Sequence, residues 1–175
     1  NQQKLEFMEG PVGFSNLDKV GVLTNGFDHI GTMITWYNHP YYKTHYEKLG
    51  FTVEKEYLEN KFPFKNVKSE PLQRVSSILE KRYNLIPLNF TKTKDIMPYV
   101  DKMFDLFNQS YAVLPSFVPI SQLEIDYFKK KYISFINPEY IKFVVDKDDK
   151  MIAFAITMPS FSKALQKAKG KLIPF

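Results

Sequence analysis

Apolar side chains recur at helical spacing in the first third of the chain. Tyr42, Tyr46 and Leu49 are four and three residues apart, so they share one face of a helix. Asn38 is a residue type that caps helix starts, and Pro40 fits a first helical turn. Gly50 is the residue type that ends a helix in the left-handed conformation. The pattern predicts a helix that begins near Asn38 and ends at Gly50.

Alternation of apolar and polar positions, or runs of β-branched and aromatic residues, predicts strands on both sides of this helix. Residues 51–57 place phenylalanine, valine and tyrosine on one face and threonine and glutamate on the other. Residues 4–8, 20–23 and 32–36 are shorter segments of the same kind. Glycine and proline make residues 10–16 a loop. We therefore expect several strands before residue 60.

Helical periodicity returns in the second half of the chain. Ser69 and Asp95 are N-cap residue types, and each opens a stretch in which apolar residues recur every three or four positions. Ser121 and Glu124 have the spacing of a capping box. Ser160 is of a type that caps a last short helix. The expected helices cover residues 69–83, 95–111, 121–136 and 161–169.

Three strands are predicted between these helices. Residues 85–90 form a short apolar stretch that follows the helix opened by Ser69. Residues 140–146 and 151–158 are β-branched and aromatic, and the charged turn 147–150 joins them. This is the clearest hairpin signal in the chain. Helices and strands together predict a mixed α/β (α+β) fold.

Composition excludes several classes of protein. The chain has 175 residues, of which 44% are hydrophobic and 25% charged, as in ordinary soluble globular proteins. It contains no cysteine, which excludes disulfides, thiolate catalysis and cysteine-bound metals. No apolar run approaches the roughly 20 residues that span a bilayer, and no signal peptide opens the chain. We expect a cytoplasmic protein without a membrane partner.

Both ends of the sequence indicate a trimmed fragment. The chain begins at Asn1 rather than at methionine, and it stops on the apolar residues 172–175, which would normally continue into structure. The alternative is a processed mature chain.

The stretch around Tyr46 resembles a known family. Asn38, followed by Tyr46, Glu47, Lys48, Gly50 and Phe51, resembles the late helix and following strand of the GNAT N-acetyltransferase superfamily. The resemblance implies that Asn38 borders a coenzyme A site and that Tyr46 protonates the departing thiolate. It also implies acetyl-CoA as co-substrate and an amine, of unknown identity, as acceptor. The alternatives are that Tyr46 is a core tyrosine and that Asn38 only caps the helix.

The order of elements extends the resemblance to most of the chain. Helix, helix, strand, strand over residues 95–158 resembles the opening half of a GNAT domain. The chain as a whole resembles the middle of a bacterial protein with two GNAT-like domains in tandem. Residues 1–66 would then be the C-terminal half of the first domain, residues 67–84 a connecting helix, and residues 85–175 the N-terminal half of the second.

One part of the family's machinery is missing from these residues. GNAT domains hold the coenzyme A pyrophosphate with a Gln/Arg-x-x-Gly-x-Gly/Ala loop at a helix N-terminus, where backbone N–H groups and the helix dipole favour an anion. None of the seven glycines lies in such a pattern. We therefore expect the segment by itself to bind coenzyme A poorly or not at all.

Other candidate residues give weaker signals. A general base would be Glu6, Glu9 or Asp18, but no spacing singles one out and surface solvation is the better account of each. His39 and His45 are six residues apart, a spacing that does not align them on one helix face for a metal. We expect no metal site.

Lysines cluster near the end of the chain and raise a third reading. The cluster consists of Lys163, Lys167, Lys169 and Lys171. These lysines could bind a phosphate or nucleic acid, or they could form an ordinary solvent-exposed face of a helix. No nucleic-acid-binding motif accompanies them. The sequence thus favours an N-acetyltransferase, with a non-catalytic GNAT-fold interaction module as the alternative and a nucleic-acid binder third. It gives no indication of oligomeric state.

Overall fold

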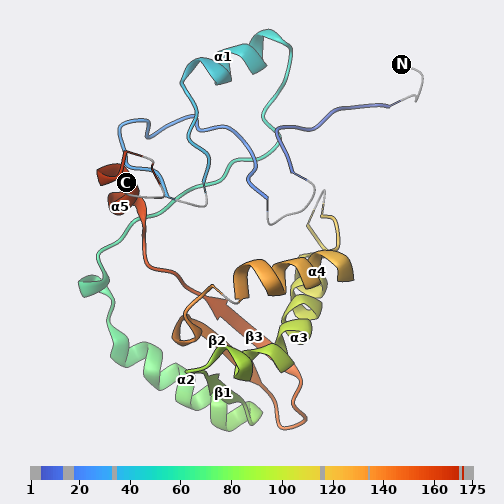
Figure 1. Cartoon of the computed structure of the whole chain (residues 1–175), viewed down its shortest axis with the longest axis vertical. Coiled ribbons are helices and arrows are strands. Elements are labelled where there is room, and N and C mark those ends of the chain that lie inside the picture. Colours follow the sequence, from blue (N-terminus) through green and yellow to red (C-terminus); the bar gives the residue numbers. More distant parts are fainter. Residues whose placement is uncertain are drawn as a thin grey trace. The chain divides into compact units, whose positions relative to one another are not determined.

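The structure is a computed structural model that describes residues 5–13, 18–32, 35–114, 117–133, 135–169 and 171. Contacts within the chain divide it into two units, which are described separately (Figure 1). Unit 1 consists of Asn1–Tyr57 and Pro159–Phe175, and unit 2 consists of Leu58–Met158. The described residues contain five α-helices and one three-stranded antiparallel sheet, which confirms the mixed α/β class. The assignment of residues 1–66, 67–84 and 85–175 to parts of two GNAT-like domains stays a prediction.

The sheet of unit 2 confirms the three strands predicted for the second half of the chain. β1 is Ile86–Asn89, β2 is Ile141–Val145 and β3 is Met151–Ile156. The strands lie in the order β1-β2-β3, and each pair is antiparallel. The register places Leu88, Phe143 and Phe154 side by side across the sheet.

The β2–β3 turn is held by a carboxylate. Asp146 Oδ1 accepts hydrogen bonds from the backbone N–H groups of Asp148 (2.9 Å) and Lys150 (3.0 Å). Asp149 has a φ of 59°, a left-handed conformation that aspartate tolerates better than most residues. The predicted hairpin is therefore confirmed, and its polar turn residues explain its geometry.

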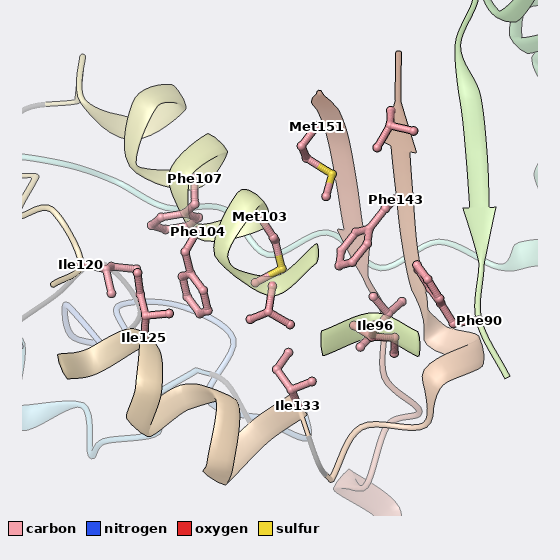
Figure 2. Close-up of a cluster of buried hydrophobic side chains, with 13 residues drawn as sticks. Phe90, Ile96, Met103, Phe104, Phe107, Ile120, Ile125, Ile133, Phe143 and Met151 are labelled. Carbon is pink, nitrogen blue, oxygen red and sulfur yellow. The ribbon is translucent and has the colours of Figure 1, made fainter. Parts of the chain in front are cut away.

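Two helices supply most of the rest of the core of unit 2. α3 is Thr93–Tyr111, and α4, Gln122–Phe128, continues into a π-helical turn over Lys129–Ile133. Figure 2 shows the labelled apolar side chains of the helices and of the strands gathered in one cluster. The buried set is Phe90, Ile96, Val100, Met103, Phe104, Phe107, Ile120, Ile125, Ile133, Ile141, Phe143, Val145 and Met151.

Phe143 lies at the centre of this core. Its side chain is fully buried, and its ring meets that of Phe90 edge to face with centroids 5.4 Å apart. Tyr99, on α3, contacts the same ring at 6.1 Å. The apolar residues that recur at helical spacing along α3 are Ile96, Val100, Met103, Phe107 and Tyr111, and all but Tyr111 are buried. The stripe is therefore the face that covers the sheet.

Polar contacts cap the start of α4 and tie this helix to α3. The Ser121 side chain accepts from Glu124 N–H while Glu124 Oε2 accepts from Ser121 N–H at 2.8 Å, which confirms the capping box. Asn108 of α3 accepts from Ile120 N–H at 2.9 Å and donates to Ile120 O at 3.0 Å. Lys129 Nζ lies 2.6 Å from Asp101, and this hydrogen bond raises the pKa of Lys129.

Two predicted helix caps are wrong. α2 is Ser69–Tyr83 with Lys68 at its N-cap, and α3 has Lys92 there; neither helix has a side-chain cap. Asp95 instead lies in the first turn of α3, where its carboxylate faces the positive end of the helix dipole. Because α3 begins before Asp95, Pro98 lies inside the helix, and one helical hydrogen bond is missing there.

α2 differs from the other helices of unit 2 because none of its residues is buried. Asn84 ends it in the left-handed conformation, with a φ of 52°. Its predicted apolar stripe is present but exposed, and consists of Leu72, Val75, Ile78, Leu79 and Tyr83. The remaining short helical turns of unit 2 are the 3-10 segments Phe64–Asn66 and Pro138–Tyr140.

The strands predicted for unit 1 are wrong wherever the structure describes them. Residues 5–8, 20–23 and 51–57, and the described part of residues 32–36, contain no strand. Alternation stabilises a strand only when a neighbour pairs with it and one face is covered. Val53 and Tyr57 are instead 72% exposed. The two helices of unit 1 are confirmed: α1 is Tyr41–Lys48, and α5 is Ser162–Lys167 with Phe161 rather than Ser160 at its N-cap.

Phe143→Ala should lower the free energy of unfolding of unit 2 by about 3–5 kcal/mol, because it removes a fully buried ring and leaves a cavity. The matched control is Ile152→Ala, on the same sheet, whose side chain is 41% exposed. We expect the control to lose less than about 1 kcal/mol. Urea unfolding of the 175-residue chain followed by circular dichroism measures both. Equal losses would contradict the central place of Phe143.

Candidate functional site

The end of α1 is a Schellman motif built around Tyr46. Phe51 N–H donates to Tyr46 O, and Gly50 N–H donates to Glu47 O, each at 3.0 Å. Gly50 has a φ of 85°, which an L-residue adopts only with strain. The Tyr46 and Phe51 rings meet edge to face at 5.3 Å, the apolar contact that commonly accompanies this motif. The motif gives Tyr46, Gly50 and Phe51 a structural role.

Asn38 ties α1 to an upstream segment instead of capping it. Its Oδ1 accepts from Leu23 N–H at 2.6 Å, and its Nδ2 donates to Leu23 O at 3.4 Å and to His39 O at 3.0 Å. Pro40 occupies the N-cap position, and no side chain caps the helix. The prediction of Asn38 as helix cap is therefore wrong. Its side-chain amide instead pairs with a backbone, much as a strand neighbour does. Its role as a cofactor contact stays a prediction.

A hollow of about 350 Å³ lies against α1. Five residues line it: Tyr41, Tyr42, His45, Tyr46 and Leu49. Half-buried Tyr46, the predicted catalytic residue, is thus part of the same site as three other aromatic rings. Asn38 is not among the lining residues, so the structure does not bring the two predicted site residues together in this hollow.

Stacked rings form one wall of the hollow. The Tyr41 ring stacks on His39 at 5.8 Å and on Tyr42 at 4.8 Å, and it meets His45 at 5.4 Å. A hydrogen bond with the side chain of Tyr42 raises the pKa of the Tyr41 hydroxyl. The sequence pattern placed Tyr42 and Tyr46 on one helix face, but it did not indicate that Tyr41 and His45 line a binding site. The repeated aromatics at spacings of three to four were the signal that was available.

The other predicted functional residues do not contribute to this hollow. None of the general-base candidates Glu6, Glu9 and Asp18 is among its lining residues, and Glu9 forms an ion pair with Lys55 at 3.4 Å. Within the described ranges, no group of three or more histidine, aspartate or glutamate residues is placed to hold a metal. The lysines at the end of the chain, on and after α5, are exposed.

Unit 2 has a second hollow, of about 430 Å³, which the sequence did not indicate. It lies between α3 and the start of β3, and its lining includes Lys102, Asp105, Asp149 and Ile152. Lys102 Nζ contacts the Asp149 carboxylate and donates to Asp149 O at 2.9 Å. These contacts join α3 to the β2–β3 turn. The charged groups of Lys102 and Asp149 at the border of the hollow are therefore already paired with each other.

The helices in the described part of the chain are all too short or too polar to cross a membrane.

Gly50→Ala should destabilise unit 1 by about 1–2 kcal/mol, because alanine is strained at a φ of 85° although nothing lies near the added methyl group. Gly31→Ala is the matched control: its added methyl group also meets nothing, and its backbone is not left-handed. The fluorescence of Trp36, the single tryptophan, reports unfolding of unit 1. A control effect as large as that of Gly50→Ala would refute the strain argument.

Asn38→Ala should speed hydrogen exchange of the Leu23 amide roughly three- to tenfold, because one hydrogen bond of ordinary strength is lost. Asn25→Ala, which removes an exposed asparagine of the same segment, should leave that rate unchanged. Exchange measured residue by residue by NMR tests both. An unchanged Leu23 rate in Asn38→Ala would show that this contact does not hold the segment.

Comparison with known proteins gives one distant relative. No family model matches the chain, and no solved structure matches it. Protein YghO of Escherichia coli (strain K12) is 21% identical over 169 residues, which cover 96% of this chain and 42% of YghO. The chain therefore spans about two fifths of the length of this relative, and the name of the relative states no activity.

Proposed function

We propose that this chain is part of a GNAT-type N-acetyltransferase, which transfers an acetyl group from acetyl-CoA to an amine. The observation that carries the proposal is the topology of unit 2. β1 is followed by two helices, α3 and α4, and then by β2 and β3, in one sheet whose sequential strands are antiparallel. This is the order that the resemblance implies for the opening half of a GNAT domain.

The end of α1 supports the proposal independently. The residues that carry the family resemblance, Tyr46, Gly50 and Phe51, form one compact motif. That motif holds the Tyr46 ring half-buried at the edge of a hollow large enough for a small ligand. A phenol in this position is suited to proton transfer because its ring is fixed while its surroundings stay open to a substrate.

The proposed reaction follows ordinary acyl transfer. The neutral amine nitrogen attacks the thioester carbonyl carbon, a C–N bond forms, and the C–S bond breaks. Tyr46 gives its proton to the departing thiolate, the proton lost by the amine passes to solvent, and solvent then returns a proton to the Tyr46 phenolate. Asn38 would border the cofactor, although its side chain would have to retain or exchange its bonds to Leu23.

The chain's glycines set a limit on cofactor binding. None lies in the pyrophosphate-binding pattern, so the proposal assigns that contact to residues other than these 175. Weak binding of acetyl-CoA by the chain alone and stronger binding by the complete gene product are both expected.

The alternative is a non-catalytic GNAT-fold module that binds another macromolecule. The observation in its favour is α2, an amphipathic helix with no buried residue and an exposed apolar stripe that includes Leu72, Val75 and Leu79. Exposed stripes of this kind occur where a helix meets a partner. This alternative predicts no response to acetyl-CoA.

Tyr46→Phe tests the proposed role of Tyr46 in the complete gene product. Phenylalanine keeps the ring contact with Phe51 and removes only the hydroxyl, so stability should persist while acetyl transfer falls about 100-fold. Tyr57→Phe, at a 72% exposed tyrosine, is the matched control and should keep full activity. Release of coenzyme A thiol, measured with a panel of amines, gives the rates.

Thermal melting with and without acetyl-CoA provides the outcome that separates the two functions. Stabilisation of the complete gene product supports the enzyme. Neither stabilisation nor thiol release with any amine would refute it and leave the interaction module.

A further inference from the structure

A continuous row of aromatic rings leads to the hollow on α1. Phe27 meets Tyr37 at 6.5 Å, and Tyr37 meets His39 at 6.3 Å. The row then continues through the stacked rings of His39, Tyr41 and Tyr42. Tyr41 and Tyr42 are about half exposed, with 53% and 42% of their surface open to solvent. A stack of this kind with open faces offers a surface on which another ring can pack.

The hollow is also chemically uniform. With about 100° of rotation per helical residue, its five lining residues fall within an arc of about 140° of α1. Lys43 and Glu47 lie outside that arc and form an ion pair with each other at 3.8 Å. Among the residues that the structure describes, no lysine, arginine or carboxylate lines the hollow. Its recognition groups are therefore ring faces, tyrosine hydroxyls and the imidazole of His45.

These features favour one kind of ligand. A planar aromatic ring gains offset or edge-to-face contacts with Tyr41 and Tyr42 in addition to burial, whereas an aliphatic group gains burial alone. A volume of about 350 Å³ is near the lower end of the range for small-molecule sites, so one or two rings fill it. The uncharged lining gives no reason for an anionic ligand.

We propose that this hollow binds an aromatic amine and that such an amine is the acetyl acceptor. The requirement for a ring rests on the hollow itself, and the amine rests on the proposed function. Tyr46 connects the two because it lines the hollow and is also assigned as the proton donor. A ring stacked on Tyr42 would bring an amine on a short side chain to the same wall as the Tyr46 hydroxyl.

The binding test uses the 175-residue chain and two amines of matched size and charge. Phenethylamine carries an aromatic ring, and 2-cyclohexylethylamine carries a saturated one. In an NMR titration we expect phenethylamine to shift the ring signals of Tyr41 and Tyr42 and to bind roughly three- to tenfold more tightly than the saturated amine. Equal binding of the two, or binding of neither, would overturn the inference.

Variants of Tyr42 locate the contact. Tyr42→Leu should lower the affinity for phenethylamine roughly three- to tenfold, whereas Tyr42→Phe keeps the ring and should bind as the unchanged chain does. Tyr57→Leu, outside the hollow, is the surface control. The backbone NMR spectrum of each variant shows whether unit 1 still folds. An affinity unaffected by Tyr42→Leu in a folded chain would contradict the proposed site.

Further outcomes distinguish this inference from the function on which it rests. Ring-dependent binding without acetyl transfer by the complete gene product would keep the site and refute the enzyme. Acetyl transfer to saturated and aromatic amines at equal rates would keep the enzyme and refute the ring requirement. Concentration-dependent broadening of the Tyr41 and Tyr42 signals without ligand would identify the hollow as an interface between copies and overturn the inference.

Discussion

Unit 2 depends on one packing interaction, the burial of the inner face of the sheet beneath α3. Phe143 on the central strand is fully enclosed, with Phe90 and Tyr99 against its ring. This contact covers the apolar face that β1 and β2, separated by two helices in the chain, would otherwise leave in water when they pair. The polar contacts of Asn108 and Lys129 then tie α4 to α3, but they do not replace the buried area.

The site in unit 1 depends on a different constraint. Gly50 turns the chain at the end of α1, and the turn brings Phe51 back onto Tyr46. The Tyr46 ring is thereby fixed from one side and left open toward the hollow from the other. A residue that closes a helix in this way is also well placed to present a functional group, because its position is determined by backbone hydrogen bonds rather than by a deep core.

Sequence patterns predicted the elements that depend on local interactions. Three examples are the capping box at Ser121, the charged β2–β3 turn and the apolar stripe of α3. The residues that stabilise each of them lie within the element itself, so each appears where it was expected. The strand predictions in unit 1 were wrong because alternation specifies only which face would be buried, and the described residues of unit 1 include no neighbouring strand to pair with these segments. The prediction of Asn38 as a helix cap was wrong for a related reason. Its side-chain amide hydrogen-bonds to the backbone of Leu23, fifteen residues away, and no local sequence pattern indicates that contact. The sequence indicated part of the hollow, because it placed Tyr42, Tyr46 and Leu49 on one face of the predicted helix. That pattern is equally consistent with a buried core face and with a binding site.

The position of the Tyr46 ring connects the structure of α1 with the proposed reaction, because the Tyr46 hydroxyl is the assigned proton donor. An experimental structure of the complete gene product with acetyl-CoA tests this most directly, through the distance between the Tyr46 hydroxyl and the thioester sulfur. The account predicts a separation of roughly 3–3.5 Å, within reach for proton transfer. A cofactor bound with its sulfur far from Tyr46, or turned away from the hollow on α1, would contradict it.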